Sequence, residues 1–122
     1  MKQRPIVRTA HAYAQAHEIS DFSRLLFISG QVPENERGEV PADFDWQCRL
    51  AWANVDRRLK SAGMTFDNLV KVTIFLADRS YREANARIRR EVLGDRSPAL
   101  TVIITGIYDD RWLLEIEAVE GA

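Results

Sequence analysis

The sequence predicts an α+β domain in which two helices cover one face of a mixed sheet. Two amphipathic helical patterns and several short apolar strand patterns follow one another in the order β-β-α-β-α-β-β. The composition, 46% hydrophobic and 29% charged, is typical of a globular chain. With 122 residues and no linker, repeat or low-complexity tract, residues 1–122 are expected to form a single domain.

Two segments have the apolar spacing of helices. The first helix is expected to begin after Asp43, whose carboxylate can cap the first turn, and to end at Gly63. Its apolar stripe comprises Phe44, Cys48, Ala51, Val55, Leu59 and Ala62. The second helix is expected from about Ser80, its N-cap, to Leu93, with Gly94 as its stop. Its stripe comprises Tyr81, Ala84, Ile88 and Val92, so each helix has one face to bury.

The strands are expected at Leu25–Ser29, Leu69–Ala77, Leu100–Thr105 and Trp112–Val119, and Ile6–Ala10 is expected to add one more before them. In the second of these segments, Val70, Val72, Ile74 and Leu76 share one face, opposite Lys71, Thr73 and Phe75. In the last, Leu114, Ile116 and Ala118 lie opposite Leu113, Glu115, Glu117 and Val119. Both faces of the sheet are therefore expected to carry apolar side chains.

The second face of this sheet has no cover within the chain. Two helices can cover only one face, yet Phe75, Leu113 and Val119 lie on the other. The missing cover is expected to come from another subunit, so the sequence predicts a homo-oligomer with contacts through the sheet. Glu115 and Glu117 would lie in or near that interface, where an ionised carboxylate needs a partner, a ligand or water.

Charge and cysteine content exclude several classes of protein. The 17 basic and 18 acidic residues give a net charge of −1, so no basic field for nucleic acid is expected. Cys48 is the only cysteine, so no internal disulfide forms, and with His11 and His17 it lacks the spacing of a metal site. The N-terminus shows no secretory signal, and the longest charge-free stretch, Ser97–Tyr108, is too short to span a bilayer. We expect a cytoplasmic protein without a membrane or nucleic-acid partner.

Several segments, read in order, resemble the RidA/YjgF family. These are Leu26–Pro33, Gly38–Asp43, Ala62–Asp78 and Leu114–Val119, and Asn85 lies where the family has an asparagine in its second helix. Each piece is a weak signal, but together they run from Tyr13 to Val119 in the family's order. The resemblance implies the chorismate-mutase-like fold and a homotrimer with clefts between its subunits.

The resemblance also implies a chemistry. In archetypal members the cleft binds small 2-imino, 2-enamino or 2-oxo acids, and water hydrolyses the imine to a ketone and ammonia without a metal or organic cofactor. Glu115 matches a position that orients the attacking water, as a general base would. The positions that would contact the ligand are Tyr13, Ser29, Gly30, Asn85, Leu100 and Thr101.

Each of these residues also has a structural interpretation. Glu115 would pair with an arginine across the interface, and Gly30 would form a β-bulge. Thr101 would be an ordinary strand residue and Tyr13 a packed aromatic. Asn85 would bridge backbone groups between elements. Glu117 is expected to be structural, and Cys48 to pack in the core.

One departure from the family bears on activity. Active deaminases carry Pro-Ala-Arg-Ser or Pro-Ala-Arg-Thr, whereas this chain has Pro98-Ala99-Leu100-Thr101. A guanidinium gives a carboxylate two charge-assisted hydrogen bonds, and leucine gives none. Losing one member of a buried charge pair costs roughly 2–5 kcal/mol, a loss of affinity of about 30-fold to several thousand-fold. Arg96 and Arg111 are the candidates to replace the missing arginine.

Two functions follow from these observations. In the first, the cleft hydrolyses or tautomerises a small imine, enamine or carbonyl compound that lacks the usual carboxylate, with Glu115 activating water and Gly30 and Thr101 holding the polar group. Because Leu100 replaces the arginine, hydrolysis of 2-imino acids by the archetypal route is not expected. In the second, the trimer binds a ligand or partner without catalysis, since a fold does not determine a function. A third activity attached to the family, ribonuclease, fits poorly with a net charge of −1.

Overall fold

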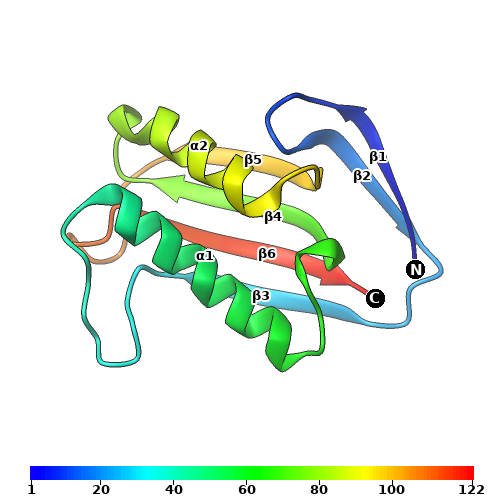
Figure 1. The fold of residues 1–122 in the computed structure, drawn as a ribbon, viewed down its shortest axis with the longest axis horizontal. Coiled ribbons are helices and arrows are strands. Elements are labelled where there is room, and N and C mark those ends of the chain that lie inside the picture. The colour runs from blue at the N-terminus through cyan, green and yellow to red at the C-terminus, as the bar shows by residue number, and fades with distance from the viewer.

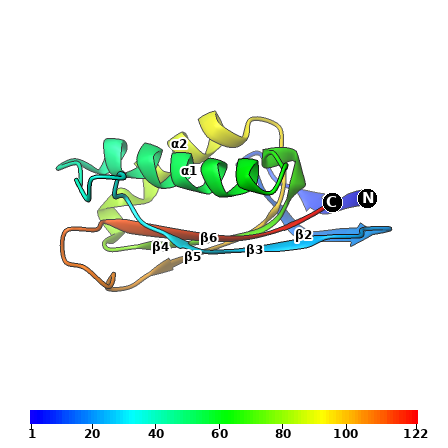
Figure 2. The same ribbon diagram turned by 90° about the horizontal axis from the view of Figure 1, so that it is seen from below.

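Six strands form one mixed sheet in the order β1-β2-β5-β4-β6-β3 (Figure 1). The computed structural model describes residues 1–122. The strands are β1 (Lys2–Arg8), β2 (Ala14–Ser20), β3 (Leu25–Gln31), β4 (Leu69–Leu76), β5 (Ala99–Ile104) and β6 (Leu114–Gly121), and the helices are α1 (Phe44–Ser61) and α2 (Arg82–Leu93). Both helices lie on the same face of the sheet, and the opposite face is bare (Figure 2). The predicted α+β arrangement, two helices on one face of a mixed sheet, is confirmed.

Helix α1 begins where its sequence predicts. The Asp43 side chain accepts a hydrogen bond from the backbone N–H of Trp46 at 2.8 Å, which satisfies a donor of the first turn. At the other end, Gly63 has a φ of +70°, a conformation that glycine adopts without strain. The predicted stripe of α1 is almost wholly buried against the sheet, together with Trp52.

Helix α2 begins later than expected. Asp78, not Ser80, is the capping residue: its side chain accepts from the Ser80 N–H at 2.8 Å and starts a single 3₁₀ turn, Arg79–Tyr81. The α-helix follows at Arg82 without a side-chain cap of its own. The predicted C-terminal end of α2 is confirmed: Gly94 follows Leu93 with a φ of +62° and closes the last turn.

The N-terminal hairpin was predicted incompletely. One strand was expected at Ile6–Ala10, but the chain forms two, β1 and β2, which pair antiparallel from Lys2–Ser20 to Arg8–Ala14. The sequence of β2 has no run of alternating apolar residues, and most of it is exposed. It joins the sheet at one point, where Ala14 pairs in parallel with Ala99. Because most of its side chains are exposed, β2 has no buried face whose alternation would predict it.

From Val72 onward, the two faces of the central strands differ as their alternation predicts. At the start of β4 the expectation for Val70 is wrong, because a register shift between Leu69 and Lys71 buries Leu69 instead. The helix-covered face contains Val72, Ile74, Leu76, Leu114, Ile116 and Ala118, each at most 4% exposed. The uncovered face, here called the open face, contains Phe27, Ser29, Lys71, Thr73, Phe75, Thr101, Ile103, Glu115, Glu117 and Val119. Phe27 on this face is 72% exposed. None of the helices is both long and apolar enough to cross a membrane.

Candidate functional site

The open face carries a shallow cavity of about 390 Å³. Strands β3, β4 and β6 supply its lining, which includes Phe27, Ser29, Lys71, Thr73, Glu117 and Val119. Two of these side chains are apolar and two carry opposite charges, so the cavity suits a small molecule that is partly polar. Of the residues predicted to contact a ligand, Ser29 lines it directly.

Lys71 connects this cavity to Thr101. The ammonium Nζ of Lys71 donates a hydrogen bond to the Thr101 hydroxyl Oγ1 at 2.6 Å, from β4 to β5. No carboxylate lies within ion-pair distance of Lys71, whereas the other lysines, Lys2 and Lys60, pair with Asp21 and Asp56. Lys71 is thus the one cation that lines the cavity, and it has no counter-ion within the protomer.

Glu115 lies against the backbone of Gly30. A Cβ atom placed on Gly30 would overlap the Glu115 carboxylate and come within 2.9 Å of its Cγ. Gly30 also lies in an irregular stretch of β3, where the pairing with β6 shifts between Ile28 and Gln31. The bulge that the sequence allowed is therefore present, and the close approach made by this glycine is to a side chain of the same protomer.

The Glu115 carboxylate is partly buried and has no hydrogen-bond or ion-pair partner in the protomer. Burial is the main cause that raises its pKa above the ordinary value, and the negative charge of Glu117 adds to the effect. A carboxylate with a raised pKa is a stronger base for water. The arrangement can therefore accept a proton from a water molecule that lies over the open face.

A second group of predicted residues lies on the helix side of the sheet. Tyr13 precedes β2, and its ring centroid lies 5.9 Å from the guanidinium carbon of Arg89 on α2. Arg89 is 4% exposed and donates through Nε and Nη2 to the backbone carbonyl of His11, at 3.3 and 3.1 Å. Asn85, one turn earlier, is buried and its Oδ1 has no hydrogen-bond partner, so this oxygen bridges no backbone groups.

Leu100 belongs to this second group. It pairs in register with Val72, a core residue, whereas its neighbour Thr101 pairs with Thr73 on the open face. Paired residues point to the same side of a sheet, and Leu100 packs against the hydrophobic core. Within one protomer, Leu100 and Glu115 therefore point from opposite faces of the sheet.

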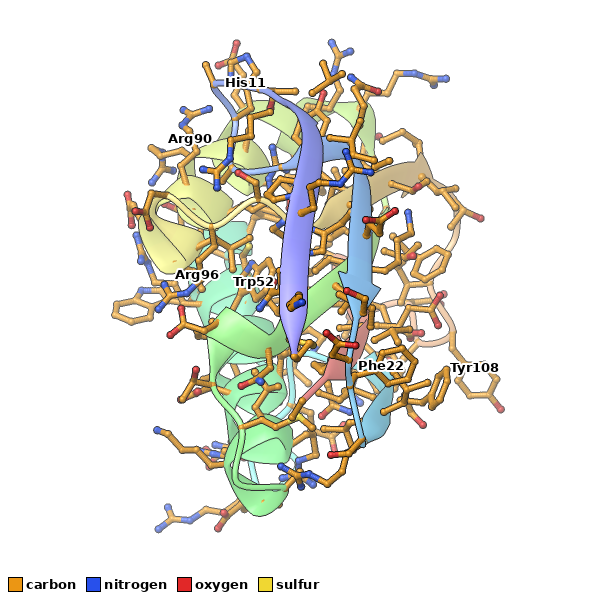
Figure 3. The ribbon with its side chains drawn as sticks, turned by 90° about the vertical axis from the view of Figure 1, so that its right-hand side faces the viewer. His11, Phe22, Trp52, Arg90, Arg96 and Tyr108 are labelled. Atoms are coloured by element: carbon orange, nitrogen blue, oxygen red, sulfur yellow. The ribbon has the colours of Figure 1, made fainter.

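The two arginines considered as replacements are held elsewhere. Arg96 donates through Nε to Asp67 Oδ1 at 2.7 Å and through Nη1 to the carbonyl of Leu93. Figure 3 shows Arg96 on the helix side of the molecule, away from Tyr108, which projects beyond the opposite side. Arg111 forms a 3.0 Å ion pair with Asp109 in the turn before β6. Neither guanidinium lines the open-face cavity.

Sequence reasoning did not assign Lys71 or Arg89 to a site. The alternation along β4 predicts the face on which Lys71 lies, but its contact with Thr101 depends on the register between β4 and β5. The burial of Arg89 could have been predicted from the sequence, because its spacing from Asn85 and Leu93 puts it on the buried side of α2. Cys48 is fully buried as expected, and burial raises the pKa of its thiol to about 12.

Comparison with known proteins supports the resemblance. The family model described as Endoribonuclease L-PSP matches residues 1–120. A RutC family protein from Aquifex aeolicus is 41% identical over 107 residues, which is 86% of this chain and 82% of that protein. The RutC family protein YjgH from Escherichia coli is 44% identical over 68 residues, which is 56% of this chain and 50% of that protein.

Two further relatives bear on chemistry and fold. The putative reactive intermediate deaminase TdcF of Escherichia coli is 37% identical over 59 residues, 48% of this chain and 46% of that protein. The crystal structure of the Rid-family protein YyfB of Yersinia pestis, whose function is unknown, covers all of both chains with a TM-score of 0.85 at 23% identity. The match over nearly the whole length and the shared fold show that the chain belongs to the RidA/YjgF family.

Proposed function

We propose that this protein hydrolyses a small imine or enamine, with Glu115 as the catalytic base. The observation that carries the proposal is the Glu115 carboxylate itself, held against Gly30 without a partner and with a raised pKa. The relative named as a putative reactive intermediate deaminase supports this class of reaction. The reaction needs only water as co-reactant.

In this reaction Glu115 takes a proton from water as the water oxygen forms a bond to the imine carbon. The proton then passes to the nitrogen, which gives a carbinolamine. The hydroxyl proton of the carbinolamine is next transferred to the nitrogen as the carbon–nitrogen bond breaks and the carbonyl double bond forms, and a carbonyl compound and ammonia leave. General-base catalysis of this kind contributes about 10²–10⁴-fold in rate. Ser29 and Thr101 supply hydroxyl groups on the same face, which can hold the polar atoms of the substrate.

Position 100 lacks the arginine that would bind a substrate carboxylate. Leu100 donates no hydrogen bond, and Arg96 and Arg111 are engaged with Asp67 and Asp109. Deamination of 2-imino acids by a guanidinium-clamped route is therefore not part of the proposal. The binding of substrate depends instead on the groups of the open face.

We propose that the protein acts as a cytoplasmic homotrimer in which neighbouring copies cover the open face. Phe27 is 72% exposed and Ile103 is 41% exposed on this face, so the isolated protomer leaves large apolar side chains in water. Each cleft would then lie between the open face of one protomer, which carries Glu115, and elements of the next protomer. RNA cleavage is not proposed, because the cavity contains a single cation and the net charge is −1.

The test generates 2-iminobutyrate in a coupled assay and follows ammonia release with and without the protein, and it repeats the measurement with an uncharged imine. We expect faster release from the uncharged imine with the wild type, and a rate reduced about 100-fold or more for Glu115→Gln. Glu83→Gln, at an exposed carboxylate on α2, is the matched control and should retain the wild-type rate. If the wild type accelerates neither this reaction nor hydrolysis of an uncharged imine, the alternative holds and the trimer binds its ligand without catalysis.

A further inference from the structure

We infer that a cavity between the N-terminal hairpin and the rest of the sheet binds a small zwitterion, a free α-amino acid. This hairpin cavity has a volume of about 380 Å³ and lies between β1, β2, the turn that precedes β4 and the connection from α2 to β5. It shares no lining residue with the cavity of the open face, and Glu115 is not among its walls. The inference therefore goes beyond the proposed function and does not depend on it.

Two opposite charges in the hairpin cavity have no partner. Arg8 is the last residue of β1 and Asp95 follows the end of α2, and neither takes part in a salt bridge or a side-chain hydrogen bond of the protomer. The remaining arginine and aspartate of the lining pair with each other, since Arg96 donates through Nε to Asp67 Oδ1 at 2.7 Å. The cavity thus offers one free cation and one free anion, the complement of a molecule that carries both a carboxylate and an ammonium group.

The walls of the hairpin cavity are fixed by hydrogen bonds that leave the two free charges untouched. The ring nitrogens of His17 lie 2.9 Å from the carbonyl oxygen of Ser97 and 2.9 Å from Gln3 Oε1. The Gln3 amide in turn donates through Nε2 to the carbonyl of Asp67 at 2.7 Å. These contacts join both strands of the hairpin to the turn before β4 and to the segment before β5. A site whose walls are already in place loses little conformational entropy when a ligand binds.

A break in β1 brings Arg8 to the cavity. Gln3 and Pro5, two residues apart, both line it, so regular alternation would place Val7 there next. Val7 instead has a φ of +56°, an unusual conformation for a β-branched residue, and it is 67% exposed. Arg8 lines the cavity in its place. Local backbone strain of this kind is typical of positions where a side chain is needed for binding.

The chemistry of the walls assigns each part of the amino acid. The Arg8 guanidinium can donate two parallel hydrogen bonds to the carboxylate. The Asp95 carboxylate can accept from the ammonium group, which is also favoured there by the negative end of the α2 dipole. Phe66 and Leu69 supply apolar surface in the same cavity, so an aliphatic side chain can pack against them. The ligand is therefore an amino acid with an apolar side chain.

The test titrates the protein with L-leucine in a calorimeter and compares two analogues that each lack one charge. Isoamylamine is leucine without its carboxylate, and isocaproate is leucine without its ammonium group. We expect the wild type to bind L-leucine at least about 10-fold more tightly than either analogue, because each analogue loses one charge-assisted interaction. This comparison needs no variant, so it does not depend on how any substitution folds.

Variants at the two free charges test the assignment. Arg8→Met should weaken L-leucine binding about 10-fold and remove the difference between L-leucine and isoamylamine. Asp95→Asn should remove the difference between L-leucine and isocaproate. Arg8→Lys keeps the charge and should retain most of the affinity. Arg82→Met and Asp110→Asn, at exposed residues outside the cavity, are the matched controls and should bind as the wild type does.

Three results would overturn the inference. The first is no binding of L-leucine to the wild type at millimolar concentration, as expected if Arg8 and Asp95 only pair with each other in solution. The second is equal binding of L-leucine and both analogues, or a loss in the control variants equal to that in Arg8→Met. The third is a loss that follows Lys71→Met and not Arg8→Met, because Lys71 lines the other cavity and the ligand would then lie on the open face.

Discussion

The Glu115 carboxylate occupies the space where residue 30 would carry a side chain. Even the Cγ of Glu115 is only 2.9 Å from the position of a Cβ at Gly30, too close for any real contact. Gly30 has no positive φ, so its backbone conformation is open to other residues. The glycine is therefore required by Glu115 and not by the chain's own conformation.

Gly30→Ala should move the Glu115 carboxylate without unfolding the protein. We expect kcat for imine hydrolysis to fall at least 10-fold, because a general base must stay within hydrogen-bond reach of its water. Gly106→Ala is the matched control, since nothing lies within 4 Å of a Cβ at that position. Steady-state kinetics of both variants measure the effect. Equal activity of Gly30→Ala and wild type would show that the position of Glu115 does not matter for turnover.

The activity should fall at acidic pH as Glu115 becomes protonated. Burial, and then the charge of Glu117, raise the pKa of Glu115 above its ordinary value, so the acidic limb of kcat/KM should lie above that of a free glutamate. Glu117→Gln removes the second cause and should shift this limb to lower pH. A pH–rate profile of both proteins measures the shift. A limb that stays in place would assign it to a group other than Glu115.

The helices and the faces of the central strands could be predicted because their side chains have to repeat with the period of the structure. Val55 and Leu59 are buried on α1, and Val72 and Ile116 are buried on the sheet. Strand β2, between β1 and β5, could not be predicted in this way, because most of its side chains are exposed and it has no buried face that repeats. The 3₁₀ turn before α2 likewise depends on which of two nearby side chains, Asp78 or Ser80, provides the cap.

The candidate site was predictable as a set of residues but not as an arrangement. Alternation along one strand indicates that Glu115 and Glu117 share a face. Which of Leu100 and Thr101 lies on the open face depends on the register of β5 against β4, some 30 residues away in sequence. No local pattern specifies that register. The contact between Lys71 and Thr101 arises from the same register.

The Cys48 thiol should be inert in the folded protein. It is fully buried, and burial raises the pKa of the thiol to about 12, so almost no thiolate exists at neutral pH. We expect no modification by iodoacetamide at pH 7.5 under native conditions and complete modification in denaturant, as measured by mass spectrometry. Rapid modification of the native protein would show that α1 opens readily from the sheet.

Glu120 should make the stability of the protein depend on pH. Its side chain is fully buried on β6, beside Leu26 of β3 and Leu69 of β4, and neither carboxylate oxygen has a hydrogen-bond partner. Burial raises its pKa from 4.5 to about 8. Between these two values the folded protein keeps a proton that the unfolded chain loses. The free energy of unfolding should therefore fall as the pH rises through this window, by up to about 1.4 kcal/mol per pH unit.

Glu120→Gln removes this ionisation while keeping the size of the side chain. The variant should lack the downward slope between about pH 4.5 and pH 8, and its advantage over the wild type should grow with pH and level off above pH 8. Denaturant unfolding at one fixed protein concentration, repeated at pH 5, 6, 7 and 8, measures the difference. Glu83→Gln, at an exposed carboxylate, should keep the wild-type slope. Parallel curves for Glu120→Gln and wild type would mean that Glu120 is solvated or finds a cationic partner in the assembled protein.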